Sequence, residues 1–88
     1  MPVHPRLLKA ARVLLDWTQQ KLADKAGVSL TVVHRLETGY SIRASSWFRI
    51  QDALEAGGVV FIDATGDSGY GVRLDVPLPE PFQGKSSK

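Results

Sequence analysis

The fold of this chain is decided by residues 19–38, QQKLADKAGVSLTVVHRLET. Thr18 and Ser29 are residue types that cap a helix N-terminus, because their hydroxyl oxygen accepts a hydrogen bond from a free backbone N–H group. Gly27 is typical of a helix C-terminus, where a residue without a Cβ adopts the left-handed conformation without steric penalty. The spacing predicts a helix over residues 19–26, a turn of about three residues, and a second helix from Ser29 to about Thr38, ended by Gly39.

Two helices that cross steeply over a tight turn need small residues where their backbones approach. Ala23 and Gly27 occupy those positions. The apolar contacts that hold the helices at a fixed angle are assigned to Leu22, Ala26, Val28, Val33 and Leu36. The residues that remain for the exposed face of the second helix are Leu30, Thr31, Val32, His34 and Arg35.

Apolar residues at helical spacing predict one further helix on each side of this unit. The preceding helix begins at Pro5, a residue tolerated in a first turn, and its apolar stripe is Leu8, Ala11 and Leu15. The following helix is expected to be capped by Ser45 or Ser46 and to end at Gly57. One face of it carries Trp47, Ile50 and Leu54.

The C-terminal third of the chain has a different character. Residues 59–62 are β-branched or aromatic, and apolar and polar residues alternate over 72–76, so we expect a β-hairpin. An isolated hairpin is marginally stable in water, so it must pack on the helices or pair with a second chain, and the sequence leaves open which pairing occurs. We therefore divide the chain into a helical domain (1–58), a hairpin (59–76) and an extended, mobile, proline-rich tail (77–88).

Composition excludes several classes of protein. A chain of 88 residues with 43% hydrophobic and 23% charged residues is expected to form one globular unit. No apolar run is long enough for a membrane helix and no secretory signal is present, so a cytoplasmic location is expected. The chain has no cysteine, and His4 and His34 are not at ligand spacing, so we expect no metal and no cofactor. It also lacks a nucleophile–base pair and a phosphate-binding loop, which argues against an enzyme.

The charge is distributed unevenly although its net value is only +2. Residues 1–58 contain eight basic and five acidic side chains, whereas residues 59–88 contain three basic and four acidic ones. The two parts of the chain are therefore expected to face different partners.

The central segment resembles the helix-turn-helix of the Cro/C1-type (XRE) family of phage and bacterial repressors. The resemblance covers Arg6 to Leu54, and its most specific pieces are WTQQKLADKAGVS (17–29) and RLETG (35–39). It implies a mainly α, lambda-repressor-like bundle of four to five helices. It further implies a transcriptional regulator that binds double-stranded DNA as a homodimer, on a pseudo-palindromic operator with half-sites about 34 Å apart.

The same resemblance assigns roles to individual residues. Base contacts fall on Leu30, Thr31, Val32, His34 and Arg35. Arg35 can fork onto guanine O6 and N7, and Thr31 can meet a thymine methyl or a base edge. Leu30 departs from the polar residue that many relatives carry, so it offers apolar contact alone. Phosphate contacts are expected from Gln19 through the resemblance and, by their chemistry, from Ser29, Tyr40, Ser41, Arg43 and Ser45.

Two structural roles complete these expectations. The family often pairs the positions of Arg12 and Glu37 in a partly buried ion pair. Trp17 and Trp47 are interpreted as core residues.

We expect Val59, Val60, Phe61 and Ile62 to form the dimer interface by pairing with the same strand of a second copy. The alternative is a protein-interaction module of antitoxin or anti-activator type, which would bind a partner protein through the strands and the tail.

Overall fold

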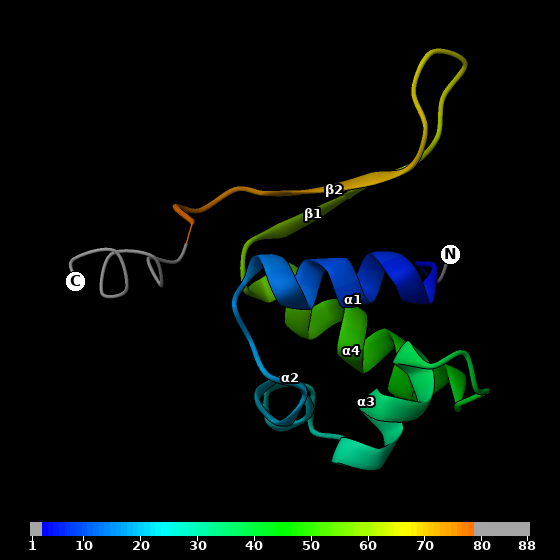
Figure 1. Ribbon diagram of the computed structural model, residues 1–88, viewed down its shortest axis with the longest axis vertical. Coiled ribbons are helices and arrows are strands. Elements are labelled where there is room, and N and C mark those ends of the chain that lie inside the picture. The colour runs from blue at the N-terminus through cyan, green and yellow to red at the C-terminus, as the bar shows by residue number, and fades with distance from the viewer. Residues whose placement is uncertain (1–2, 79–88) are drawn as a thin grey trace, which may run out of the picture.

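The computed structural model describes residues 3–78 and contains four helices followed by a two-stranded hairpin. The helices are α1 (Pro5–Leu14), α2 (Gln19–Ala26), α3 (Leu30–Glu37) and α4 (Ala44–Ala56), and the strands are β1 (Val59–Ile62) and β2 (Gly71–Leu74). Figure 1 shows the hairpin lying over α1, with α2 and α3 on the opposite side of the bundle. The predicted fold class is confirmed. Most of the predicted tail, residues 79–88, lies outside the described residues.

The α2–turn–α3 unit forms as the sequence predicts. Thr18 Oγ1 accepts a hydrogen bond from the backbone N–H of Lys21 at 3.0 Å, and Ser29 Oγ accepts one from that of Val32 at 3.2 Å. Gly27 ends α2 with a φ of +71°, in the left-handed region that favours glycine. These local interactions define both ends of the turn.

The observed ends of α1 and α4 agree only in part with the ends predicted from the sequence. Helix α1 begins at Pro5 as predicted. Its C-terminus is followed by Asp16 in the left-handed region (φ +59°), which the sequence did not predict because the residue is not a glycine. The predicted serine cap of α4 is wrong. Helix α4 begins at Ala44 after an extended Arg43 that makes no side-chain capping bond, so Ser45 and Ser46 lie within the first turn.

The core is formed by side chains from all four helices and from β1. Val33, Ile50 and Leu54 have no exposed surface, and Leu8, Leu22 and Leu36 are each 1% exposed. Trp17 and Trp47 are partly buried and pack against this cluster. Side chains of α1 and α4 pack in the same core as those of α2 and α3, so the whole bundle fixes the angle between α2 and α3.

The hairpin pairs within the chain and shares the helical core. Its strands are antiparallel, with Val59 opposite Leu74 and Phe61 opposite Val72. These four side chains pack inward, and Val59 is only 3% exposed. Because side chains alternate across a strand, Val60, Ile62 and Arg73 face outward. We call these three residues the outer hairpin face.

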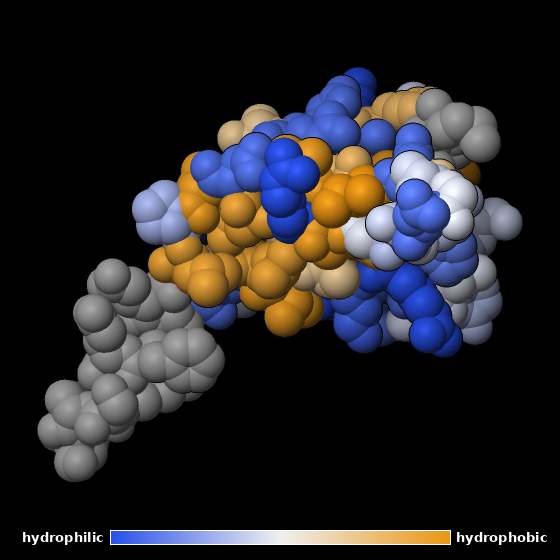
Figure 2. Space-filling view, turned by 90° about the horizontal axis from the view of Figure 1, so that it is seen from above, coloured by the Kyte–Doolittle hydropathy of each residue, from blue (hydrophilic) through white to orange (hydrophobic). Residues whose placement is uncertain are grey.

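The outer hairpin face is partly apolar. Its apolar members are Val60 and Ile62. Beyond the end of β2, Val76 is 44% exposed, and its methyl groups lie 2.8 Å and 2.9 Å from the position that a Cβ of Gly58 would take. Figure 2 views the molecule from the hairpin side and shows hydrophobic residues gathered over the middle of this face. Among the described residues, no helix is both long and apolar enough to cross a membrane.

Gly57, which connects α4 to the hairpin, packs closely against Trp17 and Leu15. A Cβ at this position would lie 2.9 Å and 3.0 Å from ring atoms of Trp17, and 3.0 Å from a methyl group of Leu15. We expect Gly57→Ala to lower the free energy of unfolding by about 1–3 kcal/mol through overpacking, measured by urea denaturation. Gly66→Ala is the control, since nothing lies within 4 Å of its Cβ position. Equal stability of the two variants would show that Trp17 moves aside freely.

Candidate nucleic-acid interface

One face of α3 is anchored in the core and the other is exposed. Val33 and Leu36 are three residues apart, so they lie on the same side of the helix, and both are buried. Leu30 is consequently 43% exposed, and Thr31, His34 and Arg35 are exposed as well. Val32 is half-buried and packs against the core. The exposed face of α3 therefore consists mainly of Leu30, Thr31, His34 and Arg35.

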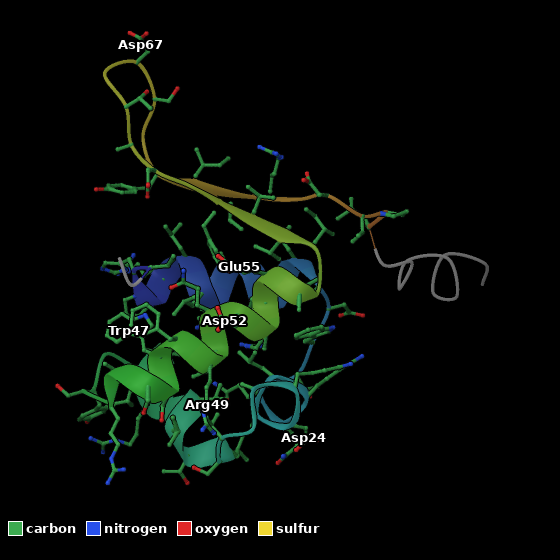
Figure 3. All side chains as sticks on the ribbon, turned by 180° about the vertical axis from the view of Figure 1, so that it is seen from behind. Asp24, Trp47, Arg49, Asp52, Glu55 and Asp67 are labelled. Carbon is green, nitrogen blue, oxygen red and sulfur yellow. The ribbon has the colours of Figure 1, made fainter. Side chains whose placement is uncertain are left out.

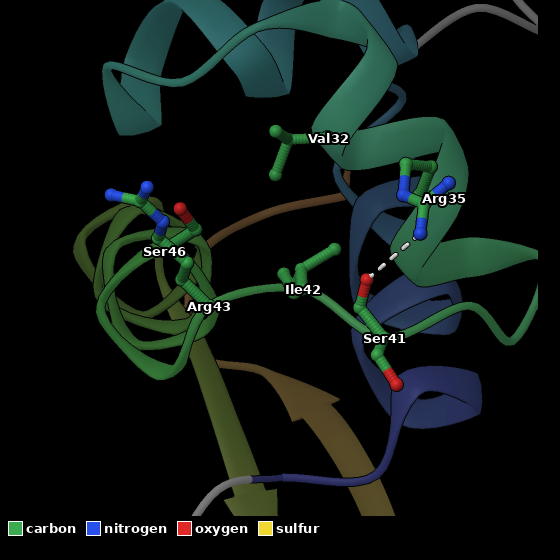
Figure 4. A pocket seen from close by; sticks show the side chains of 6 residues that line it. All are labelled: Val32, Arg35, Ser41, Ile42, Arg43 and Ser46. Atoms are coloured by element: carbon green, nitrogen blue, oxygen red, sulfur yellow. Dashed lines mark hydrogen bonds between the residues drawn. The ribbon is translucent and has the colours of Figure 1, made fainter.

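Arg35 is held beside the loop that follows α3. Its guanidinium carbon lies 5.1 Å from the centre of the Tyr40 ring, and its Nη2 donates a hydrogen bond to the backbone oxygen of Ser41 at 3.2 Å. Figure 4 shows this bond at the edge of a hollow between α3 and the start of α4. Stacking and hydrogen bonding together restrict the directions in which the guanidinium points.

The hollow has a volume of about 590 Å³ and is open to solvent. Helix α3 supplies Val32 and Arg35, the loop supplies residues 41–43, and α4 supplies Ser46. The lining therefore combines two guanidinium groups and two serine hydroxyls with the apolar side chains of Val32 and Ile42. This mixture suits a polyanion whose bases also carry apolar groups.

The sign of this surface follows from where the carboxylates lie. Between residues 29 and 50 the one acidic residue is Glu37. On α4 the charges are separated, since Arg49 lies beside α2 and α3 whereas Asp52 and Glu55 lie toward α1 and the hairpin (Figure 3). The side that carries α3 is therefore positively charged.

Glu37 itself is turned inward and its charge is compensated. Its side chain is 2% exposed and accepts hydrogen bonds from Arg12 Nε at 2.7 Å, Arg12 Nη2 at 3.0 Å and Gln19 Nε2 at 3.0 Å. The remaining Arg12 nitrogen, Nη1, donates to the backbone oxygen of Trp17 at 2.8 Å. The ion pair thus links α1, α2 and the end of α3 without placing a negative charge on the surface.

The comparison with known families decides the identity of this arrangement. A helix-turn-helix family model of the Cro/C1 type matches residues 8–57, more than half of the chain. The chain belongs to the Cro/C1-type helix-turn-helix family. Proteins of this family are DNA-binding transcriptional regulators, and α3 is the second helix of the helix-turn-helix unit in this chain. No curated protein shows significant similarity to the chain.

The structure of this helix-turn-helix protein brings some of the predicted contact residues together. Val32, Arg35, Ser41 and Arg43 line the same hollow, and Leu30, Thr31 and His34 are exposed on the adjoining α3. Tyr40 and Ser45 are also exposed. Gln19 and Ser29 have partners within the chain, since the Gln19 amide donates to Glu37 and the Ser29 hydroxyl caps α3.

Other residues of this helix-turn-helix protein matter for the surface although the sequence did not single them out. Ile42 and Ser46 line the hollow, and Arg49 Nη1 donates to the backbone oxygen of Gly27 at 3.4 Å, which ties α4 to the turn before α3. Lys21 and Lys25 lie over the Trp17 ring, at 5.7 Å and 5.9 Å from its centre. The motif 17–29 contains Trp17, Lys21 and Lys25 without indicating their contact, and the contact of Arg49 with Gly27 joins elements far apart in sequence. Among residues 3–78, no cluster of three or more histidine or acidic side chains is placed to hold a metal ion.

The Arg12–Glu37 ion pair yields a stability prediction. Replacing Glu37 by alanine leaves the guanidinium of Arg12, whose side chain is 14% exposed, without its anion. We expect the free energy of unfolding to fall by about 3 kcal/mol in chemical denaturation, because an uncompensated charge remains desolvated.

The control for this prediction is the ion pair of Arg73 and Asp75, whose side chains are 58% and 50% exposed. Arg73→Ala breaks that pair at the surface, where water replaces the lost partner, so stability should hardly change. If both substitutions had the same effect, burial of the Glu37 carboxylate would not be the source of its contribution.

Proposed function

We propose that this protein binds a pseudo-palindromic operator as a dimer and regulates transcription there, with α3 of each copy in the major groove. The observation that carries this proposal is the exposed outer face of α3 beside a hollow flanked by Arg35 and Arg43. A helix of this kind fits the major groove, where base edges present distinct patterns of donors and acceptors.

Arg35 is the residue we assign to base recognition first. A guanidinium carries five N–H donors, and one N–H of Arg35 is donated to the backbone oxygen of Ser41. The donors that remain are sufficient for a bidentate contact with guanine, and the Tyr40 ring limits the conformational freedom lost on binding. Thr31 and His34 are exposed beside it, while half-buried Val32 and exposed Leu30 offer apolar contacts to thymine methyl groups.

The phosphate contacts are assigned to residues around the hollow and at helix starts. Arg43 directly precedes α4, and the exposed hydroxyl groups of Tyr40 and Ser45 are suitable donors, as are Ser41 and Ser29. Gln19 Nε2 carries two hydrogens and donates one to Glu37, so one remains for a phosphate oxygen. In this arrangement Glu37 orients Gln19 toward the DNA backbone.

Selection of bound sequences from a random double-stranded DNA pool tests the proposed function. We expect enrichment of two inverted half-sites whose centres are about one helical turn apart, and an affinity that falls as salt rises, because phosphate contacts release counterions. Selection should be repeated at two stated salt concentrations. A pool that stays random at both would rule out sequence-specific binding.

The role of Arg35 gives the second functional prediction. On the selected site, Arg35→Ala should weaken binding by about 1–3 kcal/mol and relax discrimination at one base pair of each half-site. Competition with operators altered at single positions measures both effects.

Arg43→Ala is the matched comparison, since it removes the other guanidinium of the same hollow. We expect it to weaken binding about equally on all sequences and to reduce the slope of log affinity against log salt by about one. If Arg35→Ala behaved in the same way, Arg35 would be a phosphate contact instead of a base contact.

The dimer interface is assigned to β1, with a refinement from its geometry. In the described residues β1 pairs with β2 along one edge only, so its other edge is available to a second copy. The side chains of Val59 and Phe61 pack within the chain, so a second copy would meet the backbone of β1 and the outward Val60 and Ile62. Both outward residues are half-buried in the single chain.

Two lysines on β1 test this interface. Val60→Lys with Ile62→Lys should give a monomer in light scattering at micromolar concentration and weaken binding to the full operator, because charged side chains on an edge strand oppose pairing. Asp67→Lys with Ser68→Lys places the same two residues in the hairpin loop and should leave the dimer intact. A monomeric unaltered protein would contradict the dimer and favour the alternative, a module whose hairpin face receives a different protein.

A further inference from the structure

A groove separate from the DNA-facing surface lies between the start of α1, α4 and the hairpin. Its volume is about 550 Å³, and its lining includes Val3, Pro5, Trp47, Phe61, Asp63 and Tyr70. It shares no lining residue with the hollow beside α3. The volume falls within the range of about 300–1,000 Å³ that is common for small-molecule sites.

The wall formed by Trp47 is held in place before any ligand binds. Its indole Nε1 donates to the backbone oxygen of Val3 at 2.8 Å, and the backbone N–H of Val3 donates to Gln51 Oε1 at 3.0 Å. These two bonds connect the segment before α1 to α4. Figure 3 shows Trp47 on α4, close to the N-terminal segment. Phe61 packs against the core from β1, so two of the aromatic walls are positioned by the fold.

The polar groups of the groove define the charge of a suitable ligand. Asp63 is the one acidic residue of the lining, which contains neither lysine nor arginine. Asp63 is exposed and forms no ion pair with another described residue. His4 also lines the groove, and its Nδ1 accepts a hydrogen bond from the backbone N–H of Arg6 at 3.1 Å.

Aromatic rings next to a carboxylate are complementary to an organic cation. A cation over a ring face is attracted by the ring quadrupole, and Trp47, Phe61 and Tyr70 supply three rings around the groove. The apolar residues Val3 and Pro5 add surface for the hydrophobic part of such a ligand. Asp63 offers a charged partner to a cation, whereas the lining holds no lysine or arginine for an anion.

We propose that this groove binds a small amphipathic organic cation, namely an aromatic ring system that carries one ammonium group. The ring lies against Trp47 and Phe61, and the ammonium group lies toward Asp63 and Tyr70. The proposal does not depend on DNA binding, since it concerns residues outside the DNA-facing surface, and it is tested without DNA.

Three probes of the same size and different charge test the proposal on the full chain. They are 2-(1-naphthyl)ethylamine, 2-(1-naphthyl)ethanol and 1-naphthylacetate, which are cationic, neutral and anionic at neutral pH. Titration is followed by the amide and indole N–H resonances of the ¹⁵N-labelled protein. The indole resonance of Trp47 is identified by comparison with Trp17→Phe, because the chain contains two tryptophans.

We expect saturable shifts of the Trp47 indole resonance, with the amine binding about three- to tenfold more tightly than the alcohol and the acetate binding least. Asp63→Asn should remove the preference for the amine and keep the binding of the alcohol. Asp67→Asn is the matched control: Asp67 lies in the same loop but outside the lining, so the preference should persist.

Three results would overturn the proposal. Equal binding of the three probes would mean that charge is not recognised. Shifts confined to residues of α3 would place the ligand elsewhere. A Trp47 indole resonance that moves on dilution without any probe, while the amide resonance of Val60 stays in place, would show that a second copy of the chain occupies the groove. None of these results bears on the selection of operator sequences.

Discussion

The inward-facing carboxylate of Glu37 is the contact on which the functional surface depends. It ends α3 and accepts hydrogen bonds from Arg12 of α1 and Gln19 of α2, so a single side chain joins three helices. A buried carboxylate requires such compensation, because desolvation of an unpaired charge is costly. The orientation of the exposed face of α3 is therefore coupled to the packing of α1 and α2 as well as to the turn at Gly27.

The same contact determines the electrostatics of the DNA-facing side. Glu37 is the one acidic residue between positions 29 and 50, and its compensation leaves Arg35, Arg43 and Arg49 to set the sign of that surface. Their surroundings differ. Arg35 is stacked on Tyr40 and bonded to Ser41, Arg43 borders the same hollow, and Arg49 is directed to the turn at Gly27. The net charge of +2 therefore does not show that arginine side chains gather around α3.

The hairpin is part of the same core and gives the molecule a second face. Val59 and Phe61 pack inward with Val72 and Leu74, so the strands complete the helical core. Their outward side chains and the ends of the strands remain at the surface, where they form the outer hairpin face and one wall of the groove at Trp47. DNA recognition is accordingly assigned to one side of the molecule, and dimer formation and ligand binding to two adjoining surfaces on the hairpin side that share Ile62.

Much of the fold could be predicted from short-range signals. Thr18, Ser29 and Gly27 act on backbone groups within four residues, so their effect on α2 and α3 could be predicted without knowledge of the tertiary structure. The β-branched and aromatic run 59–62 and the alternation over 72–76 likewise indicated the strands. Asp16 and the start of α4 show the limit of such signals, because Asp16 adopts the left-handed conformation without being glycine and α4 begins without a side-chain cap although two serines follow. The stacking of Arg35 on Tyr40, the bond from Gln19 to Glu37, the pairing of β1 with β2 in the same chain, and the groove at Trp47 were decided by tertiary structure alone. Each depends on the distance between elements, which no local pattern of residues encodes.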